Sequence, residues 1–198
     1  DDAVETYKVV VDLDPEDQQA LDSLERLYLR AERWTELVDI LRRRADVSMD
    51  PQERRELWSR IAMLHEEALD DREEAIRAWS SLLDENPDDL EAIRSLARLY
   101  ESAERWRDLF DMLDRELALT TDEPSQVALT FRIGQILHKR LDDAERAIFR
   151  YREVLEKDRE HSAARQALEQ LLSDDLLAMQ AAEILEPLYA AESNWEKL

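Results

Sequence analysis

Apolar side chains recur along the chain at spacings of three and four residues. Ala20, Leu21, Leu24, Leu27 and Tyr28 form one such stripe, which is the pattern of an amphipathic helix that buries one side. The same pattern predicts eleven helices and no strand, so we expect an all-α protein. The expected helices span residues 2–13, 16–30, 34–47, 51–69, 71–85, 88–102, 106–119, 123–140, 142–157, 160–172 and 175–192.

Four prolines mark expected helix starts. Each follows a residue that can cap a helix or form a turn, as in Asp14-Pro15, Asp50-Pro51, Asn86-Pro87 and Glu123-Pro124, and proline is well tolerated at the first helical position. The fifth, Pro187, lies inside the last expected helix, where the loss of a backbone hydrogen bond should kink it.

The chain contains an internal duplication. Residues 14–50 and 86–122 align without a gap at an offset of 72, and 17 of the 37 positions are identical. The strongest match is Leu27-Tyr28 and Ala31-Glu32-Arg33-Trp34 against Leu99-Tyr100 and Ala103-Glu104-Arg105-Trp106. A fixed period of this kind is typical of stacked repeat proteins.

The period predicts how the chain is organised. Blocks 14–85 and 86–157 each divide into two helical hairpins of about 36 residues, with a partial unit at 1–13 and a further helix at 160–172, so repeats fill residues 1–172. After Leu172 the signature returns only at an offset of 89, which indicates a 17-residue insertion. Residues 173–198 are therefore expected to form an irregular helical insertion and the start of another repeat. Because polar capping units are absent, we expect a fragment of a longer array.

One hairpin resembles a known family. Trp58-x2-Ile61-Ala62-x2-His65, then Ala75-x3-Trp79, then Pro87 is similar to the tetratricopeptide repeat pattern. The resemblance covers about residues 1–172 and implies a right-handed α-α superhelix of stacked antiparallel helix pairs that binds proteins or peptides.

The resemblance also implies a binding groove lined by the first helix of each hairpin. Seven basic and six acidic residues fall at the implied groove positions, so the groove should be nearly neutral and the acidity should lie elsewhere. The arginines could hold peptide carboxylates in bidentate hydrogen bonds, or could instead pair with Glu56, Glu66, Glu91 or Glu101 on neighbouring helices. Asparagine and lysine positions of the family's carboxylate clamp are not reproduced. The candidate groove residues are Arg26, Arg60, Met63, Arg94, Arg98, Phe131, Arg132 and Gln135.

Charge and composition restrict the class of partner. The net charge of −22 argues against nucleic acid and anionic membrane surfaces, both of which attract clustered lysine and arginine. The sequence has no cysteine, no apolar run long enough for a bilayer and no signal segment, so a soluble protein is expected, with a cytoplasmic location favoured. Arginine greatly outnumbers lysine, a bias associated with GC-rich bacterial genomes.

Catalytic and metal-binding patterns are not found. Position 69, four beyond His65, is leucine, which removes the two-histidine face of a zinc helix. His65 is therefore expected to pack in the core. The single glycine, Gly134, cannot build nucleophile or phosphate loops, so no catalytic residue, metal or cofactor is predicted and the chain is not expected to be an enzyme. The five tryptophans, Trp106 among them, are expected to pack between helices in the core.

Three functions remain open from the sequence. A scaffold that binds a protein or peptide is favoured by the repeat pattern. The alternatives are a structural module that self-associates or spaces other domains, and an accessory segment of an enzyme whose catalytic domain lies outside these residues. The oligomeric state is not predicted.

Overall fold

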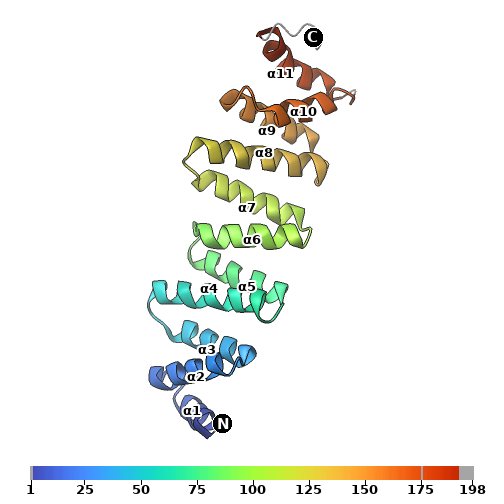
Figure 1. The fold of residues 1–198 in the computed structure, drawn as a ribbon. Helices are drawn as coiled ribbons and strands as arrows, with labels where there is room; N and C mark the ends of the chain where they lie inside the picture. Colours follow the sequence, from blue (N-terminus) through green and yellow to red (C-terminus); the bar gives the residue numbers. More distant parts are fainter. Residues whose placement is uncertain (1, 175, 192–198) are drawn as a thin grey trace. The chain divides into compact units, whose positions relative to one another are not determined.

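The computed structural model describes residues 2–174 and 176–191 and contains eleven helices and no strand within them (Figure 1). The helices are α1 (Asp2–Leu13), α2 (Gln18–Arg30), α3 (Trp34–Val47), α4 (Pro51–Glu67), α5 (Arg72–Glu85), α6 (Leu90–Ser102), α7 (Trp106–Leu119), α8 (Glu123–Lys139), α9 (Ala144–Lys157), α10 (Ser162–Leu171) and α11 (Ala178–Ala191). The all-α prediction is confirmed, and every expected helix is present to within three residues at its ends.

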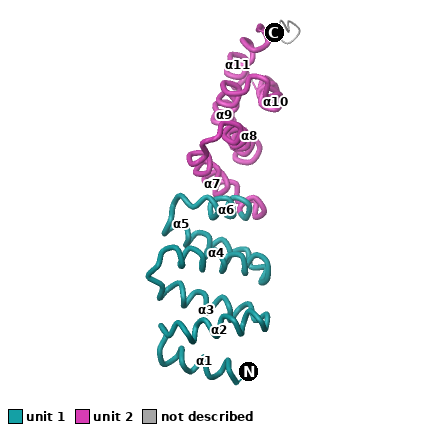
Figure 2. The backbone as a smooth tube through the Cα atoms, turned by 60° about the vertical axis from the view of Figure 1, so that its left-hand side comes forward, with its two compact units in different colours: residues 1–99 teal, residues 100–198 magenta. Residues whose placement is uncertain are grey.

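The chain forms two compact units, residues 1–99 and residues 100–198 (Figure 2). In the first unit, α1 to α5 pack each against the next in chain order, and in the second, α7 packs on α8, α8 on α9 and α9 on α10. Contacts are therefore local in sequence, as in repeat proteins whose units touch only their neighbours.

Aspartates cap most helices. Asp17, Asp50, Asp71, Asp122 and Asp143 each accept a hydrogen bond from a backbone N–H in the first turn of the following helix, which satisfies a donor that has no partner inside the helix. Hydrogen bonds from the side chain and backbone of Ser125 also lower the pKa of Asp122.

Two of the four proline starts are corrected. Pro51 is the first residue of α4, as predicted, and Pro124 is the second residue of α8. Pro15 and Pro87 lie instead in turns before α2 and α6. In these turns a later aspartate caps the helix: Asp17 for α2, and Asp89, which accepts from the backbone N–H groups of residues 91 and 92.

The turns inside the hairpins repeat with the sequence. Glu32 and Glu104 have φ of 53° and 55°, and Asp70 and Asp142 have φ of 50° and 53°. These are left-handed backbone positions that glycine usually fills, and each pair is separated by 72 residues. The duplication therefore extends to backbone conformation.

Buried leucine, isoleucine and alanine side chains between the helices form the core, together with Trp79 and Tyr151, which are 1% and 0% exposed. Gly134 lies where a Cβ atom would come within 2.8 Å of the Tyr151 ring, so its hydrogen side chain allows α8 and α9 to approach closely. Trp79 occupies the position equivalent to Tyr151 at the 72-residue offset, and Ala62 occupies the position equivalent to Gly134.

The prediction that all the tryptophans are core residues is only partly right. Trp79 is fully buried, but Trp34, Trp58 and Trp106 are half-buried. The guanidinium of Arg140 lies 4.4 Å from the Trp106 ring centre, so one face of this ring is covered by a charged side chain rather than by the core. Trp195 lies outside the described residues.

Candidate binding surface

The first helices of successive hairpins are neighbours within the first unit. Arg60 on α4 forms an ion pair with Glu25 on α2, and Arg98 on α6 forms one with Glu66 on α4 at 2.6 Å. We call the surface formed by these ion pairs and by the exposed side chains of Arg26, Leu29, Arg30, Met63 and Arg94 the first-helix face.

Arg60 and Arg98, two of the predicted groove arginines, are held by carboxylates of the protein itself. Glu25 is only 12% exposed and also accepts from Arg44, which contacts Asp22 at 3.1 Å as well. Glu66, equally buried, accepts from Arg98 and from the indole N–H of Trp79 at 2.9 Å. The alternative of ion pairing between helices is therefore confirmed for Arg98, and Arg60 pairs with a carboxylate that was not predicted.

Arg26 and Arg30 differ from these arginines. Both are exposed on the last two turns of α2, and neither has a carboxylate partner among the described residues; Arg26 donates to the backbone carbonyl of Asp22 at 3.2 Å. Leu29 lies between them and is 45% exposed, and Met63 on α4 is 41% exposed. The first-helix face thus presents two uncompensated positive charges and an apolar side chain on α2, and a second apolar side chain on α4. Arg94, the remaining predicted residue of this unit, is also exposed.

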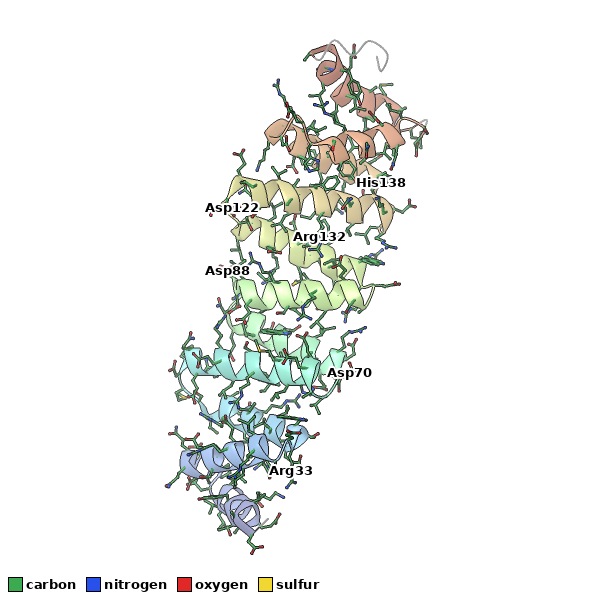
Figure 3. All side chains as sticks on the ribbon, in the orientation of Figure 1. Arg33, Asp70, Asp88, Asp122, Arg132 and His138 are labelled. Carbon is green, nitrogen blue, oxygen red and sulfur yellow. The ribbon has the colours of Figure 1, made fainter. Side chains whose placement is uncertain are left out.

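The predicted groove residues of the second unit are less accessible to a partner. Phe131 is half-buried, with its ring centre 4.6 Å from that of His161 and 5.8 Å from that of Tyr151. Arg132 pairs with Glu101 at 2.8 Å, as the alternative interpretation predicted, and Gln135 is half-buried beside it on α8. Arg132 is labelled in Figure 3.

The comparison with known families matches three segments. The description of the matching family is tetratricopeptide repeat, and the matches cover residues 20–55, 57–89 and 92–127, which together are more than half of the chain. The chain belongs to the tetratricopeptide repeat family. A search of the curated proteins found no match.

Several solved structures are similar to this tetratricopeptide chain. A MamA protein from Desulfovibrio magneticus RS-1 is 15% identical, with 98% of this chain and 97% of that chain covered and a TM-score of 0.44. YrrB, described as a TPR protein with an unusual peptide-binding site, is 14% identical over 84% and 81% with a TM-score of 0.46. The C-terminal part of a TPR repeat-containing protein from Cytophaga hutchinsonii is 11% identical over 96% and 74% with a TM-score of 0.49.

Residues that the sequence did not single out also shape this tetratricopeptide array. His161 caps α10, because its Nδ1 accepts from the backbone N–H of Ala164 at 3.1 Å. At the end of α2 the guanidinium of Arg33 lies 5.0 Å from the Tyr28 ring centre and pairs with Glu36, which lowers the pKa of that carboxyl. In the second block the guanidinium of Arg105 likewise lies over an aromatic ring, 4.6 Å from the ring centre of Tyr100. The repeated spacing of these residues in the duplication was the signal available in the sequence.

No described helix is both long and apolar enough to cross a bilayer. Among residues 2–174 and 176–191, no three histidine, aspartate or glutamate side chains come together in a way that could hold a metal ion.

His65 is buried in the first unit, as predicted, and neither ring nitrogen has a hydrogen-bond partner within the described part of the chain. Burial lowers its pKa below the ordinary 6.5, and the charge of Arg42 adds to this, against the opposite effects of Glu74 and Asp71. The folded protein therefore binds fewer protons than the unfolded chain just below pH 6.5, so stability falls as the pH is lowered through this range.

We expect a His65→Leu variant to lose part of this acid sensitivity, because leucine does not bind a proton. Leucine already occupies the equivalent position 137 of the second block. The measurement is the free energy of unfolding by urea at pH 7.5 and pH 5.5 for the natural chain and the variant. Carboxylates with lowered pKa, such as Glu36 and Glu53, lose their contribution to the free energy of unfolding only at lower pH. An equal fall in stability for both proteins would contradict the assignment.

Proposed function

We propose that this chain is a protein-binding scaffold without catalysis of its own, and that it holds a peptide segment of its partner along the first-helix face. The observation that supports the proposal is the uncompensated charge of Arg26 and Arg30 around the half-exposed Leu29, on the same face as the half-exposed Met63 of α4. Charged groups that lack an internal partner, placed beside exposed apolar side chains, are the features of a recognition surface.

The ion pairs of this surface suggest how it acts. Glu25 and Glu66 hold the guanidinium groups of Arg60 and Arg98 between adjacent first helices, so these arginines position the helices and are not required to change partner on binding. A rigid surface loses little conformational entropy when a peptide binds. The selective contacts then come from Arg26 and Arg30.

The chemistry of the expected peptide follows from the side chains that receive it. Guanidinium groups bind carboxylates in bidentate hydrogen bonds, and exposed leucine and methionine side chains gain free energy when an apolar group covers them. We therefore infer a peptide that carries an acidic residue close to an apolar one.

The double variant Arg26→Glu and Arg30→Glu tests this proposal. Peptides are first selected from a random display library for binding to the natural chain, and we expect them to carry acidic and apolar residues. Their Kd for the double variant should be at least about tenfold higher, because two attractive contacts become repulsive. The Kd is measured by titration calorimetry.

Arg43→Glu is the matched control. Arg43 is an exposed arginine on α3, the second helix of its hairpin, and it has no carboxylate partner among the described residues. We expect its Kd to stay within about twofold of the natural value. Equal losses in both variants, or unchanged binding in the double variant, would remove the first-helix face from the proposal. A molar mass that rises with concentration in light scattering, with no selectable peptide, would favour a self-associating spacer.

A further inference from the structure

A second surface of the first unit contains a cavity of about 670 Å³ between the start of α4 and the end of α5. Trp58 and Leu82 line it, and the side chains of Gln52 and Asn86 stand at its polar edge. Trp58 is half-buried and its indole N–H has no hydrogen-bond partner among the described residues. An aromatic ring with one accessible side in a cavity of this size can contact an inserted side chain.

The two arginines of the cavity are already compensated. Arg54 pairs with Glu85 at 2.9 Å and donates to the backbone carbonyl of Ser48. Arg55 pairs with Glu91 at 2.8 Å and with Asp89, which is buried. Burial opposes ionisation of Asp89, but the hydrogen bonds from Arg55 and the α6 backbone outweigh it and lower the pKa. These pairs cancel the positive charge at the cavity wall.

The charge that remains around the cavity is negative. Asp50 lines it, and Asp84 and Asp88 are exposed in the adjoining last turn of α5 and the following turn. None of the three has an ion-pair partner among the described residues. In Figure 3, Asp88 and Asp70 are labelled on opposite sides of the first unit.

At the equivalent place of the duplicated block the tryptophan is missing and the cavity is smaller. Thr130 replaces Trp58 at the 72-residue offset and is buried, and Gln126 and Lys157 replace Arg54 and Glu85. The Lys157 ammonium donates to Gln126 at 2.6 Å across the equivalent place, where the cavity is only about 260 Å³. The repeat therefore folds without the tryptophan, whereas the acidic positions are kept as Asp122, Glu156 and Glu160.

We propose that this edge of the first unit binds a basic peptide segment of a partner, with an arginine or lysine side chain over the Trp58 indole. A cation is attracted to the face of a tryptophan ring, and Asp50, Asp84 and Asp88 supply the complementary charge around it. The site is separate from the first-helix face, so it does not rest on the function proposed above.

The test uses the whole chain and a blocked pentapeptide of alternating glycine and arginine as the probe. The Trp58 indole N–H signal in the ¹H–¹⁵N spectrum, assigned with a Trp58→Phe variant, should shift saturably with this peptide and not with its glutamate counterpart. The double variant Asp84→Asn and Asp88→Asn should raise the Kd about three- to fivefold, because it removes two charges near the bound cation.

Asp70→Asn is the matched control, because Asp70 is exposed on the opposite side of the same unit and asparagine tolerates its left-handed backbone. We expect it to leave the Kd unchanged within about the experimental error, and Arg26→Glu to do the same. Trp58→Thr, which copies the residue at position 130, should abolish binding of the arginine peptide in titration calorimetry. A Trp58 signal that does not move, a stronger response to the glutamate peptide, or equal losses in the Asp70 and Asp84–Asp88 variants would overturn the proposal.

Discussion

Replacement of Trp79 by alanine is expected to lower the free energy of unfolding by about 3–5 kcal/mol. The ring is 1% exposed between α4 and α5, so the variant loses the burial of an indole and leaves a cavity. It also removes the hydrogen bond from the indole N–H to Glu66, which leaves a largely buried carboxylate with Arg98 as its remaining partner. Urea denaturation followed by far-ultraviolet circular dichroism measures the loss.

Two variants provide the comparison. Trp79→Tyr should cost much less, because Tyr151 fills the equivalent position of the second block. Trp106→Ala should cost only about 1–2 kcal/mol, since that ring is half-buried and its best-defined contact is the Arg140 guanidinium. Equal losses for the alanine variants at positions 79 and 106 would show that the core of the first unit is assigned wrongly.

Replacement of Glu25 by alanine is expected to lower the free energy of unfolding by about 2 kcal/mol. Its carboxylate receives the guanidinium groups of Arg44 and Arg60 and thereby joins α2, α3 and α4. Arg44 keeps Glu53 at 2.9 Å and Asp22, whereas Arg60 loses its ion pair. The cost is below that of a fully buried pair because both arginines remain partly hydrated, with 23% and 38% of their side chains exposed.

The cost should come from unpaired charge and not from lost packing. A double variant, Glu25→Leu with Arg60→Met, is therefore expected to recover most of the loss, since it replaces both charges of that pair while Arg44 keeps Glu53 and Asp22. Position 97, equivalent to Glu25 in the second block, is a buried alanine. Urea denaturation of both variants measures the recovery, and a double variant that is less stable than Glu25→Ala alone would contradict this explanation.

The periodic pattern was sufficient to predict the helices, their turns and the repeat. Each depends on residues close in sequence: apolar spacing sets which side of a helix is buried, and Asp50, Asp71 and Asp143 cap helices through bonds to residues two or three positions away. The motif of the hairpin from Trp58 to Pro87 then predicted the family. The division into blocks 14–85 and 86–157, and an irregular segment at 173–198, remain predictions.

The candidate surface was predicted only in part. Arg26 and Met63, which the sequence selected as groove residues, are exposed, and their part in binding remains a proposal. For the arginines the sequence offered peptide binding and ion pairing as alternatives. It did not identify Glu25 as the partner of Arg60, or the cavity at Trp58, because both depend on residues about one repeat apart.

The sequence by itself thus determined the elements, their order and the family of this protein, because these follow from local spacing and from repetition of that spacing. The tertiary structure alone decided which charges are compensated and which are exposed. Whether Arg60 or Arg30 has a carboxylate within reach depends on the rotation and offset of one helix against the next, and these are set by packing of whole side chains in the core.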